Sequence, residues 1–201
     1  MSIEEILPGL HHWTQVHPST RSRAHSHYHE PSGTLFDPLV PDEGIEWFDG
    51  RAVRRVALST RHHLRHSERF AERFDCPILA HEAGLDEFSG GPDVRGFAFG
   101  DTLADAVVAL EMDAISPDDT VLEIGAGEGA LLFADAIINR NGLGFVSDSL
   151  IGDDPEGVKR RVRERAAALA SEREFDHLLF AHGEPLIGGG KEALRRFADG
   201  R

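Results

Sequence analysis

Cysteine is nearly absent from this sequence of 201 residues, since Cys76 is its single thiol. A lone cysteine cannot form a disulfide within the chain, and it excludes the zinc modules that are built from several cysteines. No segment approaches the roughly 18 apolar residues of a membrane-spanning helix, and the start, Met-Ser-Ile-Glu-Glu, lacks the basic and apolar regions of a signal peptide. We therefore expect a soluble, cytoplasmic protein without a membrane partner, in which any metal site uses histidine and carboxylate ligands.

Basic residues are outnumbered by acids: 21 arginines and lysines stand against 35 aspartates and glutamates, which gives a net charge of −14. The one basic cluster, residues 159–165, has the pattern of a solvated helix face. Nucleic acid is therefore not an expected partner. A small-molecule substrate or ligand is expected instead, although the sequence identifies neither that molecule nor the oligomeric state.

The composition is that of a globular protein, with 40% hydrophobic and 28% charged residues. The length suits one domain of ordinary to large size, and we expect a single domain over residues 1–201.

Short strand-like segments bounded by glycine, proline and aspartate fill the first half of the chain, and helical patterns become stronger toward the end. Strands are predicted at 10–16, 23–29, 33–36, 53–59, 76–80, 106–112, 120–124, 130–134 and 176–181, and helices at 42–48, 65–74, from Pro155 onward with Asp154 as N-cap, and 191–198. The strands from 106 to 134 have the spacing of an antiparallel meander. This order predicts an α/β (α+β) protein with two sheets covered by helices, an αββα sandwich.

A glycine-rich segment, Gly125-Ala126-Gly127-Glu128-Gly129, resembles the first motif of S-adenosylmethionine-dependent methyltransferases, and Asp148 stands where a ribose-binding carboxylate would follow. Only 72 residues remain after Gly129, too few for the strand-helix units that such a cofactor cleft still needs. We therefore interpret the segment as the turn of a β-hairpin and keep the methyltransferase as the less favoured alternative.

Twelve histidines are many for this length, and one group follows a predicted strand directly: residues 60–66 read Thr-Arg-His-His-Leu-Arg-His. This junction resembles the metal-binding loop of the metallo-β-lactamase fold superfamily, Thr-His-x-His-x-Asp-His. The resemblance places the family's first histidine at Arg61, its second at His63, its aspartate at Arg65 and its last histidine at His66. Two ligand positions of the loop are therefore occupied by arginine.

The flanking segments extend the resemblance over nearly the whole chain in the family's order. The matching segments are 33–38, which resembles the early strand that ends on an acid, 76–81, 131–135 with the metal-bridging aspartate at Asp135, and 182–185 with the closing histidine at His182. The family's middle histidine corresponds to Ile115. The resemblance thus implies a metallo-β-lactamase type of sandwich with a degenerate metal motif.

The family's chemistry, hydrolysis by a metal-activated water, implies a hydrolase-like protein of unknown substrate. The resemblance leaves His63, His66, Asp135 and His182 as metal ligands, enough for at most one zinc or similar divalent ion. Equally open is a metal-free binding or structural protein, in which Arg61 and Arg65 hold a substrate or another anion. In either case we expect Arg65 to form a salt bridge with Asp135. The structural alternative is that Asp135 is a buried carboxylate with other partners and His182 is a turn residue.

A second group, His25, His27 and His29, shares one face if residues 23–29 form a strand. Such a ladder of histidines can bind a transition metal but is more often a polar face of a sheet. We expect His11 and His12 to line the same opening as this group. Three further histidines, His62, His81 and His177, are predicted to be structural or exposed.

Overall fold

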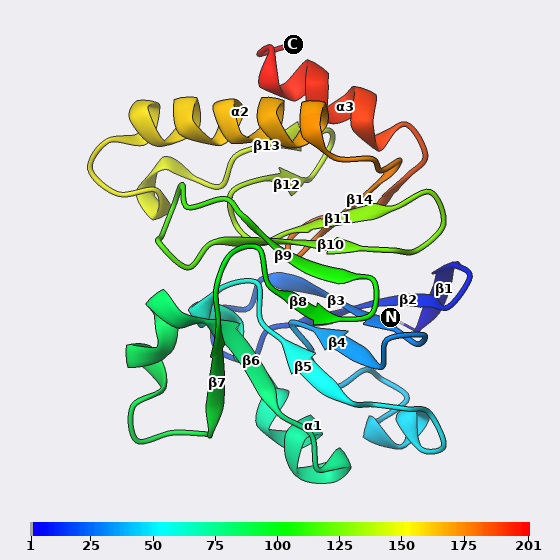
Figure 1. The fold of residues 1–201 in the computed structure, drawn as a ribbon. Helices are drawn as coiled ribbons and strands as arrows, with labels where there is room; N and C mark the ends of the chain where they lie inside the picture. The colour runs from blue at the N-terminus through cyan, green and yellow to red at the C-terminus, as the bar shows by residue number, and fades with distance from the viewer. Residues whose placement is uncertain (1) are drawn as a thin grey trace.

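The protein is described by a computed structural model that covers residues 2–201. Two β-sheets lie face to face and helices cover their outer sides, so the chain forms four layers in the order helix, sheet, sheet, helix (Figure 1). The predicted αββα sandwich is confirmed.

The first sheet has seven strands in chain order. They are β1 (Glu4–Leu7), β2 (Leu10–Val16), β3 (Arg23–His29), β4 (Thr34–Phe36), β5 (Arg55–Ala57), β6 (Ile78–His81) and β7 (Val94–Phe97). Strands β1 to β4 pair antiparallel, whereas β4 to β7 pair parallel. The outer face of this sheet carries the 3-10 helix Ile45–Phe48 and α1 (Ser67–Phe74), whose Phe48 and Phe70 pack in the core below it.

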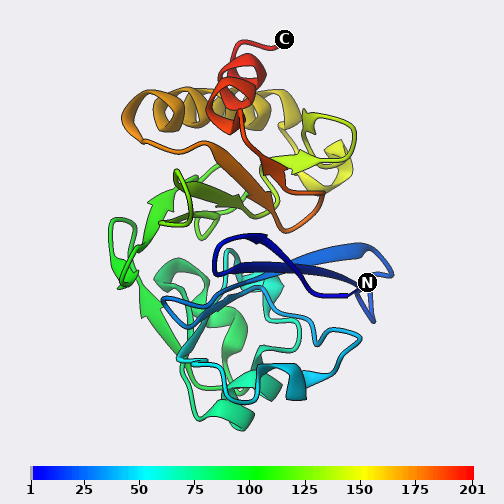
Figure 2. The ribbon, with the colours of Figure 1, turned by 90° about the vertical axis from the view of Figure 1, so that its right-hand side faces the viewer.

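The chain crosses to the second sheet between β7 and β8, as Figure 2 shows from the side. The strand order is β15 (Leu186–Ile187), β14 (His177–Phe180), β11 (Ala130–Phe133), β10 (Thr120–Ile124), β9 (Val107–Glu111) and β8 (Thr102–Ala104). Strands β9, β10 and β11 form the predicted antiparallel meander. The pair β11 and β14 is parallel.

Helices α2 (Pro155–Glu172) and α3 (Gly190–Ala198) cover the outer face of the second sheet, and the short pair β12 (Ile138–Asn139) and β13 (Leu143–Gly144) lies beside them. The predicted N-cap is confirmed, because the Asp154 carboxylate accepts a hydrogen bond from the Gly157 amide at 3.0 Å. Val158 and Val162 of α2 are buried against this sheet. Arg160, Arg161 and Arg163 of the basic cluster are exposed, as predicted for a solvated helix face.

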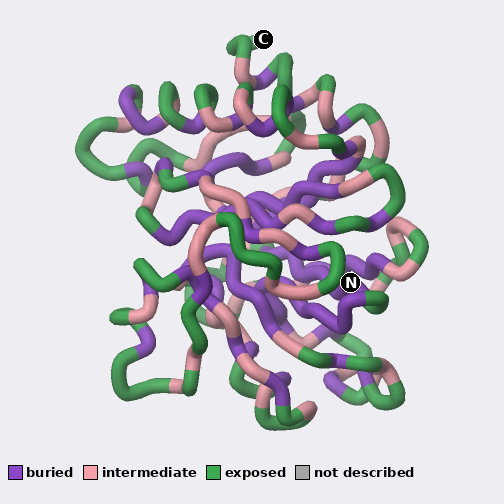
Figure 3. Tube along the Cα trace, viewed as in Figure 1, coloured by how far each residue is buried: buried purple, intermediate pink, exposed green. Residues whose placement is uncertain are grey.

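The inner faces of both sheets enclose a core that is mainly apolar, seen as the buried segments in the centre of Figure 3. Leu10 of β2 and Leu122 of β10 belong to it. In β2 the side chains alternate, so Leu10, His12 and Thr14 face this core while Trp13 packs on the opposite side. The first sheet thus carries histidines between the two sheets.

The glycine segment 125–129 is the turn of a β-hairpin, because β10 and β11 pair antiparallel with Ile124 opposite Ala130. Gly129 has φ +91°, and a β-carbon there would lie 2.7 Å from the Glu174 carbonyl oxygen. The hairpin prediction is confirmed, and the segment does not lead from a strand into a helix as the methyltransferase alternative requires.

Two predicted helices are shorter than expected. The segment 42–48 is helical only over Ile45–Phe48, and α1 begins at Ser67 rather than at residue 65. Arg65 has φ +47°, a left-handed conformation that cannot belong to a right-handed helix. Among the described residues, no helix combines the length and the apolar character needed to cross a membrane.

Candidate metal centre

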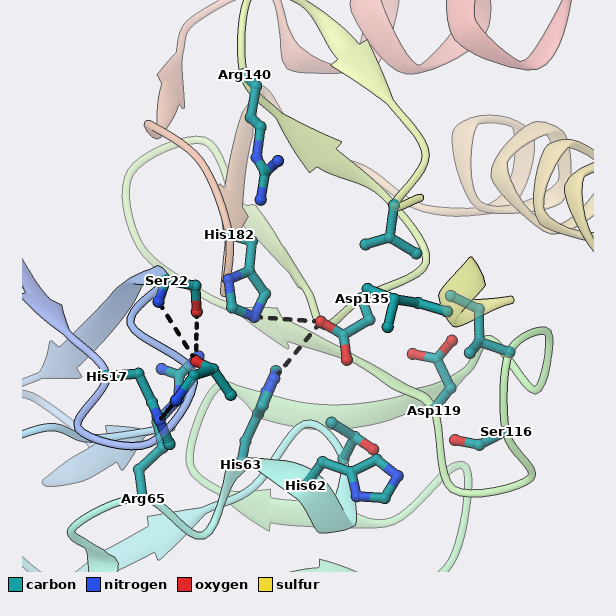
Figure 4. Close-up of a pocket in the computed structure, with 15 residues that line it drawn as sticks. His17, Ser22, His62, His63, Arg65, Ser116, Asp119, Asp135, Arg140 and His182 are labelled. Carbon is teal, nitrogen blue, oxygen red and sulfur yellow. Dashed lines mark hydrogen bonds and ion pairs between the residues drawn. The ribbon is translucent and has the colours of Figure 1, made fainter. Parts of the chain in front are cut away.

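A pocket of about 620 Å³ opens where the loops that follow β5, β11 and β14 meet (Figure 4). Both sheets contribute to it, so its lining comes from segments far apart in the sequence. Its polar side chains are His17, Thr20, Ser22, Thr60, His62, His63, Arg65, Ser116, Asp119, Asp135, Arg140 and His182.

Two of these side chains are brought together by parallel strands. Phe133 of β11 pairs with Phe180 of β14, so both strands end at the same edge of the sheet. Asp135 and His182 each follow two residues later, and their side chains approach to 3.3 Å between Oδ1 and Nε2. Loops at the carboxyl ends of parallel strands are the usual place for ligand groups.

His63 reaches the same point from the first sheet. It ends the short 3-10 helix Arg61–His63 after β5, and its Nε2 atom lies 3.6 Å from Asp135 Oδ1. The ligand atoms of His63, Asp135 and His182 all lie within 4.8 Å of one another. Two imidazole nitrogens and one carboxylate oxygen therefore converge on one small volume, a donor set that suits zinc and related divalent ions.

Asp37 fixes the orientation of the His63 ring. The carboxylate of Asp37, just after β4, lies 3.0 Å from His63 Nδ1 and accepts the Ser59 amide at 2.8 Å and the Ser59 hydroxyl. With Nδ1 donating to Asp37, the other ring nitrogen of a neutral His63 presents a lone pair toward Asp135. A carboxylate that orients a histidine in this way is the common outer support of a metal-bound imidazole.

His182 gives a further reason to place a cation here. Its Nδ1 atom lies 3.3 Å from the Arg23 carbonyl oxygen, and its Nε2 atom faces Asp135, so both nitrogens face acceptors. Burial, and then the charge of His63, lower the pKa of His182 to about 4, so the ring is neutral and has one N–H. One nitrogen lone pair must therefore point at an oxygen, and a cation beside Asp135 would remove this repulsion.

Without a metal, the cluster is held by protonated His63. Burial alone lowers the pKa of His63, but the carboxylates of Asp37 and Asp135 outweigh burial and raise this pKa to about 9. For Asp135, burial raises the pKa, but the charge of His63 outweighs it and holds the pKa below its ordinary value. The same residues thus form an ion-paired cluster when no metal is bound.

Asp119 is a buried carboxylate with unusual surroundings. It lines the pocket just before β10 and is only 2% exposed, and among the described residues no side chain donates a hydrogen bond to its carboxyl group. Burial, and then the charge of Asp135, raise the pKa of Asp119 to about 8. Asp119 is therefore mostly protonated at neutral pH and offers an O–H to the pocket.

Of the four predicted metal ligands, the structure brings together His63, Asp135 and His182 but not His66. The His66 ring lies just before α1, and its Nδ1 atom accepts a hydrogen bond from the Val40 amide at 3.0 Å. His66 is outside the group of converging ligand atoms because the left-handed turn at Arg65 directs the chain into α1.

The two predicted anion-binding arginines are both engaged. Arg61 donates to Asp118 Oδ1 from Nε at 2.8 Å and from Nη2 at 2.6 Å, and it does not line the pocket. Arg65 lines the pocket, but its Nη1 atom donates to the carbonyls of His25 and Asp37 at 2.7 and 2.6 Å. Neither guanidinium is a ready site for an anion.

The expected salt bridge between Arg65 and Asp135 is wrong. The side chains beside Asp135 are those of His63 and His182, and the Arg65 guanidinium instead hydrogen-bonds backbone oxygens. Protonated His63 supplies the positive charge that was expected from an arginine, and the neutral His182 ring faces the same carboxylate.

Sequence reasoning missed Arg140 and Asp119. Arg140 lies between β12 and β13, and Figure 4 shows its guanidinium above His182; among the described residues this side chain has no ion pair. No local pattern marks Arg140, because the β12 and β13 pair is only two residues long on each side. Asp119 had a weak signal, an Asp-Asp pair directly before a predicted strand.

The other histidines are distributed as follows. His81 and His177 accept backbone amides, from Ala83 at 3.2 Å and from Gly188 at 3.0 Å, which confirms their structural interpretation. His62 is exposed at the pocket edge. His12 joins His25 between the sheets, as expected, whereas His11 faces the other side, where its Nε2 atom lies 3.1 Å from Glu30.

Comparisons with known proteins agree with this architecture. No protein-family model matches the sequence, and no curated protein matches it. A beta-lactamase domain protein from Burkholderia ambifaria has 16% identity and a TM-score of 0.69, and the match covers 98% of this chain and 75% of that one. A metallo-β-lactamase from Hirschia baltica has 16% identity and a TM-score of 0.67, with coverage of 98% and 96%.

A flavodiiron protein from Giardia intestinalis also matches, with 13% identity and a TM-score of 0.66, over 100% of this chain and 60% of its own length. These proteins share one architecture although their names indicate different activities. The chain therefore has the metallo-β-lactamase fold, and the resemblance in the sequence is confirmed at the level of the fold.

Proposed function

We propose that this protein is a hydrolase of the metallo-β-lactamase fold that works with a single divalent metal ion, of the zinc type, on a small anionic substrate. The observation that carries the proposal is the convergence of His63 Nε2, Asp135 Oδ1 and His182 Nε2. Three protein ligands leave a fourth position for water, as in other catalytic zinc sites.

A second ion at the same centre is disfavoured by the residues that replace the family's ligands. Arg61 is paired with Asp118, Ile115 has no donor atom, and Arg65 brings a positive charge to the pocket wall. A guanidinium has no lone pair and repels a divalent cation. One ion is therefore the most that this centre is proposed to hold.

When bound, such an ion lowers the pKa of a coordinated water and polarises a carbonyl or phosphoryl group. The protein's own groups support this chemistry. Asp37 holds the Nδ1 proton of His63 so that Nε2 points inward. Asp119 holds a proton on its carboxyl at neutral pH and can donate it to a leaving group. Arg140 supplies a positive charge for an anionic group of the substrate.

The test combines metal binding with hydrolysis. Metal-stripped protein is reloaded with Zn²⁺ and offered lactam, thioester and phosphodiester substrates. Asp135→Asn should lose one equivalent of zinc together with any hydrolysis. Arg140→Gln should raise KM for anionic substrates with little change in kcat, whereas the matched exposed variant Arg160→Gln on α2 should change neither. Zinc uptake that is unchanged in Asp135→Asn would overturn the proposal.

A second candidate, a metal-free binding protein on the same fold, is favoured by one observation. Protonated His63 lies between Asp37 and Asp135 and neutralises the cluster without any metal. In that case the purified protein should neither retain nor take up zinc at Asp135, and Arg140→Gln should still weaken binding of small anions.

A further inference from the structure

A second group of potential metal ligands lies between the two sheets, outside the pocket. His12 of β2 stands opposite His27 of β3, and His25 stands opposite Thr14. Because side chains alternate along a strand, His12, His25 and His27 lie on the same face of the sheet as Leu10, which packs toward the second sheet. We call these three residues the inter-sheet histidine cluster.

The cluster is tightly packed. His12 Nε2 lies 2.9 Å from His25 Nδ1, and the ring of His12 stands 5.1 Å from those of His25 and His27, centroid to centroid. All three residues are buried, with at most 7% of their surface exposed. Desolvation by burial lowers the pKa of each of them, so the imidazoles are neutral and keep lone pairs for a ligand.

A carboxylate completes the group from the other sheet. Glu184, in the loop after β14, has an oxygen that lies within 4.8 Å of the ligand nitrogens of His12 and His25. Its backbone is held by Asn139, whose Nδ2 atom donates to the Glu184 carbonyl at 2.7 Å. The Glu184 side chain is exposed and is only loosely paired with Arg23, at 3.8 Å. The group is therefore open to solvent on one side.

His27 is the independent sign that the cluster is incomplete without a ligand. Its side chain has no exposed surface, and among the described residues neither of its ring nitrogens has a hydrogen-bond partner. A buried polar group without a partner is costly and calls for an explanation. The hydrogen bond between His12 and His25 accounts for those two rings but leaves His27 unexplained.

We propose that His12, His25 and Glu184 bind a divalent transition-metal ion of the zinc type, with His27 beside them as a further nitrogen donor. Imidazole and carboxylate ligands suit zinc. The ion would join the β2 and β3 hairpin of the first sheet to the loop after β14 of the second. This site shares no residue with the centre at Asp135, so the inference does not rest on the proposed function.

The experiment measures zinc stoichiometry and affinity in the full-length chain by competition with a chromophoric chelator. Asp135→Asn, which removes the other centre, should retain one equivalent. Glu184→Gln, an exposed change that preserves size, should weaken that equivalent by at least about tenfold, and Asp135→Asn with Glu184→Gln should bind none tightly. The matched control Glu192→Gln, an exposed glutamate on α3, should bind as the unaltered protein does.

A spectroscopic readout keeps the test valid if a variant is unstable. In Asp135→Asn, Zn²⁺ should shift the imidazole nitrogen resonances of His12 and His25 and leave those of His177 in place. Failure of Asp135→Asn to bind zinc would overturn this inference while supporting the centre at Asp135. If zinc is lost in Glu184→Gln but kept in Asp135→Asn, the result would support this inference and contradict the centre at Asp135. A chain that binds no zinc would contradict both.

Discussion

Asp119 is an acid that the fold keeps protonated. In the unfolded chain an aspartate loses its proton near pH 4, whereas burial, and then the charge of Asp135, raise the pKa of Asp119 to about 8 in the folded protein. The folded state therefore holds a proton that the unfolded state releases. The stability that this proton contributes is complete below about pH 4 and is lost as the pH rises toward 8.

We therefore predict that Asp119→Asn, which resembles the protonated acid, removes part of the decline in stability between pH 5 and pH 8. At pH 8 the variant should be more stable than the unaltered protein. Urea unfolding at both pH values measures this, and the exposed Asp153→Asn serves as the control. Equal pH slopes for Asp119→Asn and the unaltered protein would show that Asp119 is ionised in the fold.

Arg65 stabilises the junction between the two sheets through backbone oxygens. Its Nη1 atom donates to the carbonyls of His25 in β3 and Asp37 after β4, both in the first sheet, and its Nη2 atom donates to the carbonyl of Ala181 after β14, in the second sheet, at 3.4 Å. Arg65→Ala leaves these acceptors without their donor, and we expect a loss of about 2 to 4 kcal/mol of unfolding free energy. Arg69→Ala, at an exposed position of α1, should cost no more than about 0.5 kcal/mol in the same urea titration. Similar losses for both variants would contradict this role.

At the scale of elements, strand ends place the candidate ligands. Residues 131–135 and 182–185 lie at the carboxyl ends of β11 and β14, and a hydrophobic run followed by a polar residue is visible in the sequence. The local sequence does not show that these two strands are parallel neighbours, because 46 residues lie between the last residue of β11, Phe133, and the last residue of β14, Phe180. The convergence of Asp135 with His182 follows from this pairing.

The hairpin between β10 and β11 depends on glycine for two reasons that can be separated. Gly129→Ala suffers both the left-handed backbone, φ +91°, and a collision with the Glu174 carbonyl oxygen. Gly142→Ala, in the turn between β12 and β13, serves for comparison: Gly142 has φ +115°, but the space around an added β-carbon is open. We expect about 1 kcal/mol for the second variant and about 3 kcal/mol or more for the first, measured by urea unfolding. Equal costs would show that the loop at Glu174 moves to make room.

For the whole molecule, zinc binding should couple the two sheets, since His63 belongs to one half and His182 to the other. An ion at 100 times its Kd stabilises the fold by about 2.7 kcal/mol, which for a chain of this size raises Tm by about 5 to 10 °C. Calorimetry with Zn²⁺, and with Mg²⁺ as the ion that prefers oxygen ligands, measures the shift. The shift should vanish when Asp135→Asn is combined with Glu184→Gln. A rise that persists in this double variant would mean that zinc binds elsewhere.

Local sequence patterns determined most of the elements and half of the site. The strands at 10–16, 23–29 and 120–124 were predicted with the bounds that the structure has, and Asp154 was recognised as an N-cap, because alternation and capping depend only on near neighbours. The candidate ligands His63, Asp135 and His182 were found because they stand at strand ends in the order of a known fold.

Tertiary packing decided which charged groups meet. Arg65 was expected at Asp135 and instead binds backbone oxygens, and His66 was expected at the metal but accepts the Val40 amide. The left-handed turn at Arg65 directs the chain into α1, and no local sequence pattern predicts this turn. Likewise, the approach of Glu184 to His25 requires both sheets to be in place. Side-chain partners far apart in the chain are set by packing, because their energies depend on directions and distances that only the folded molecule has.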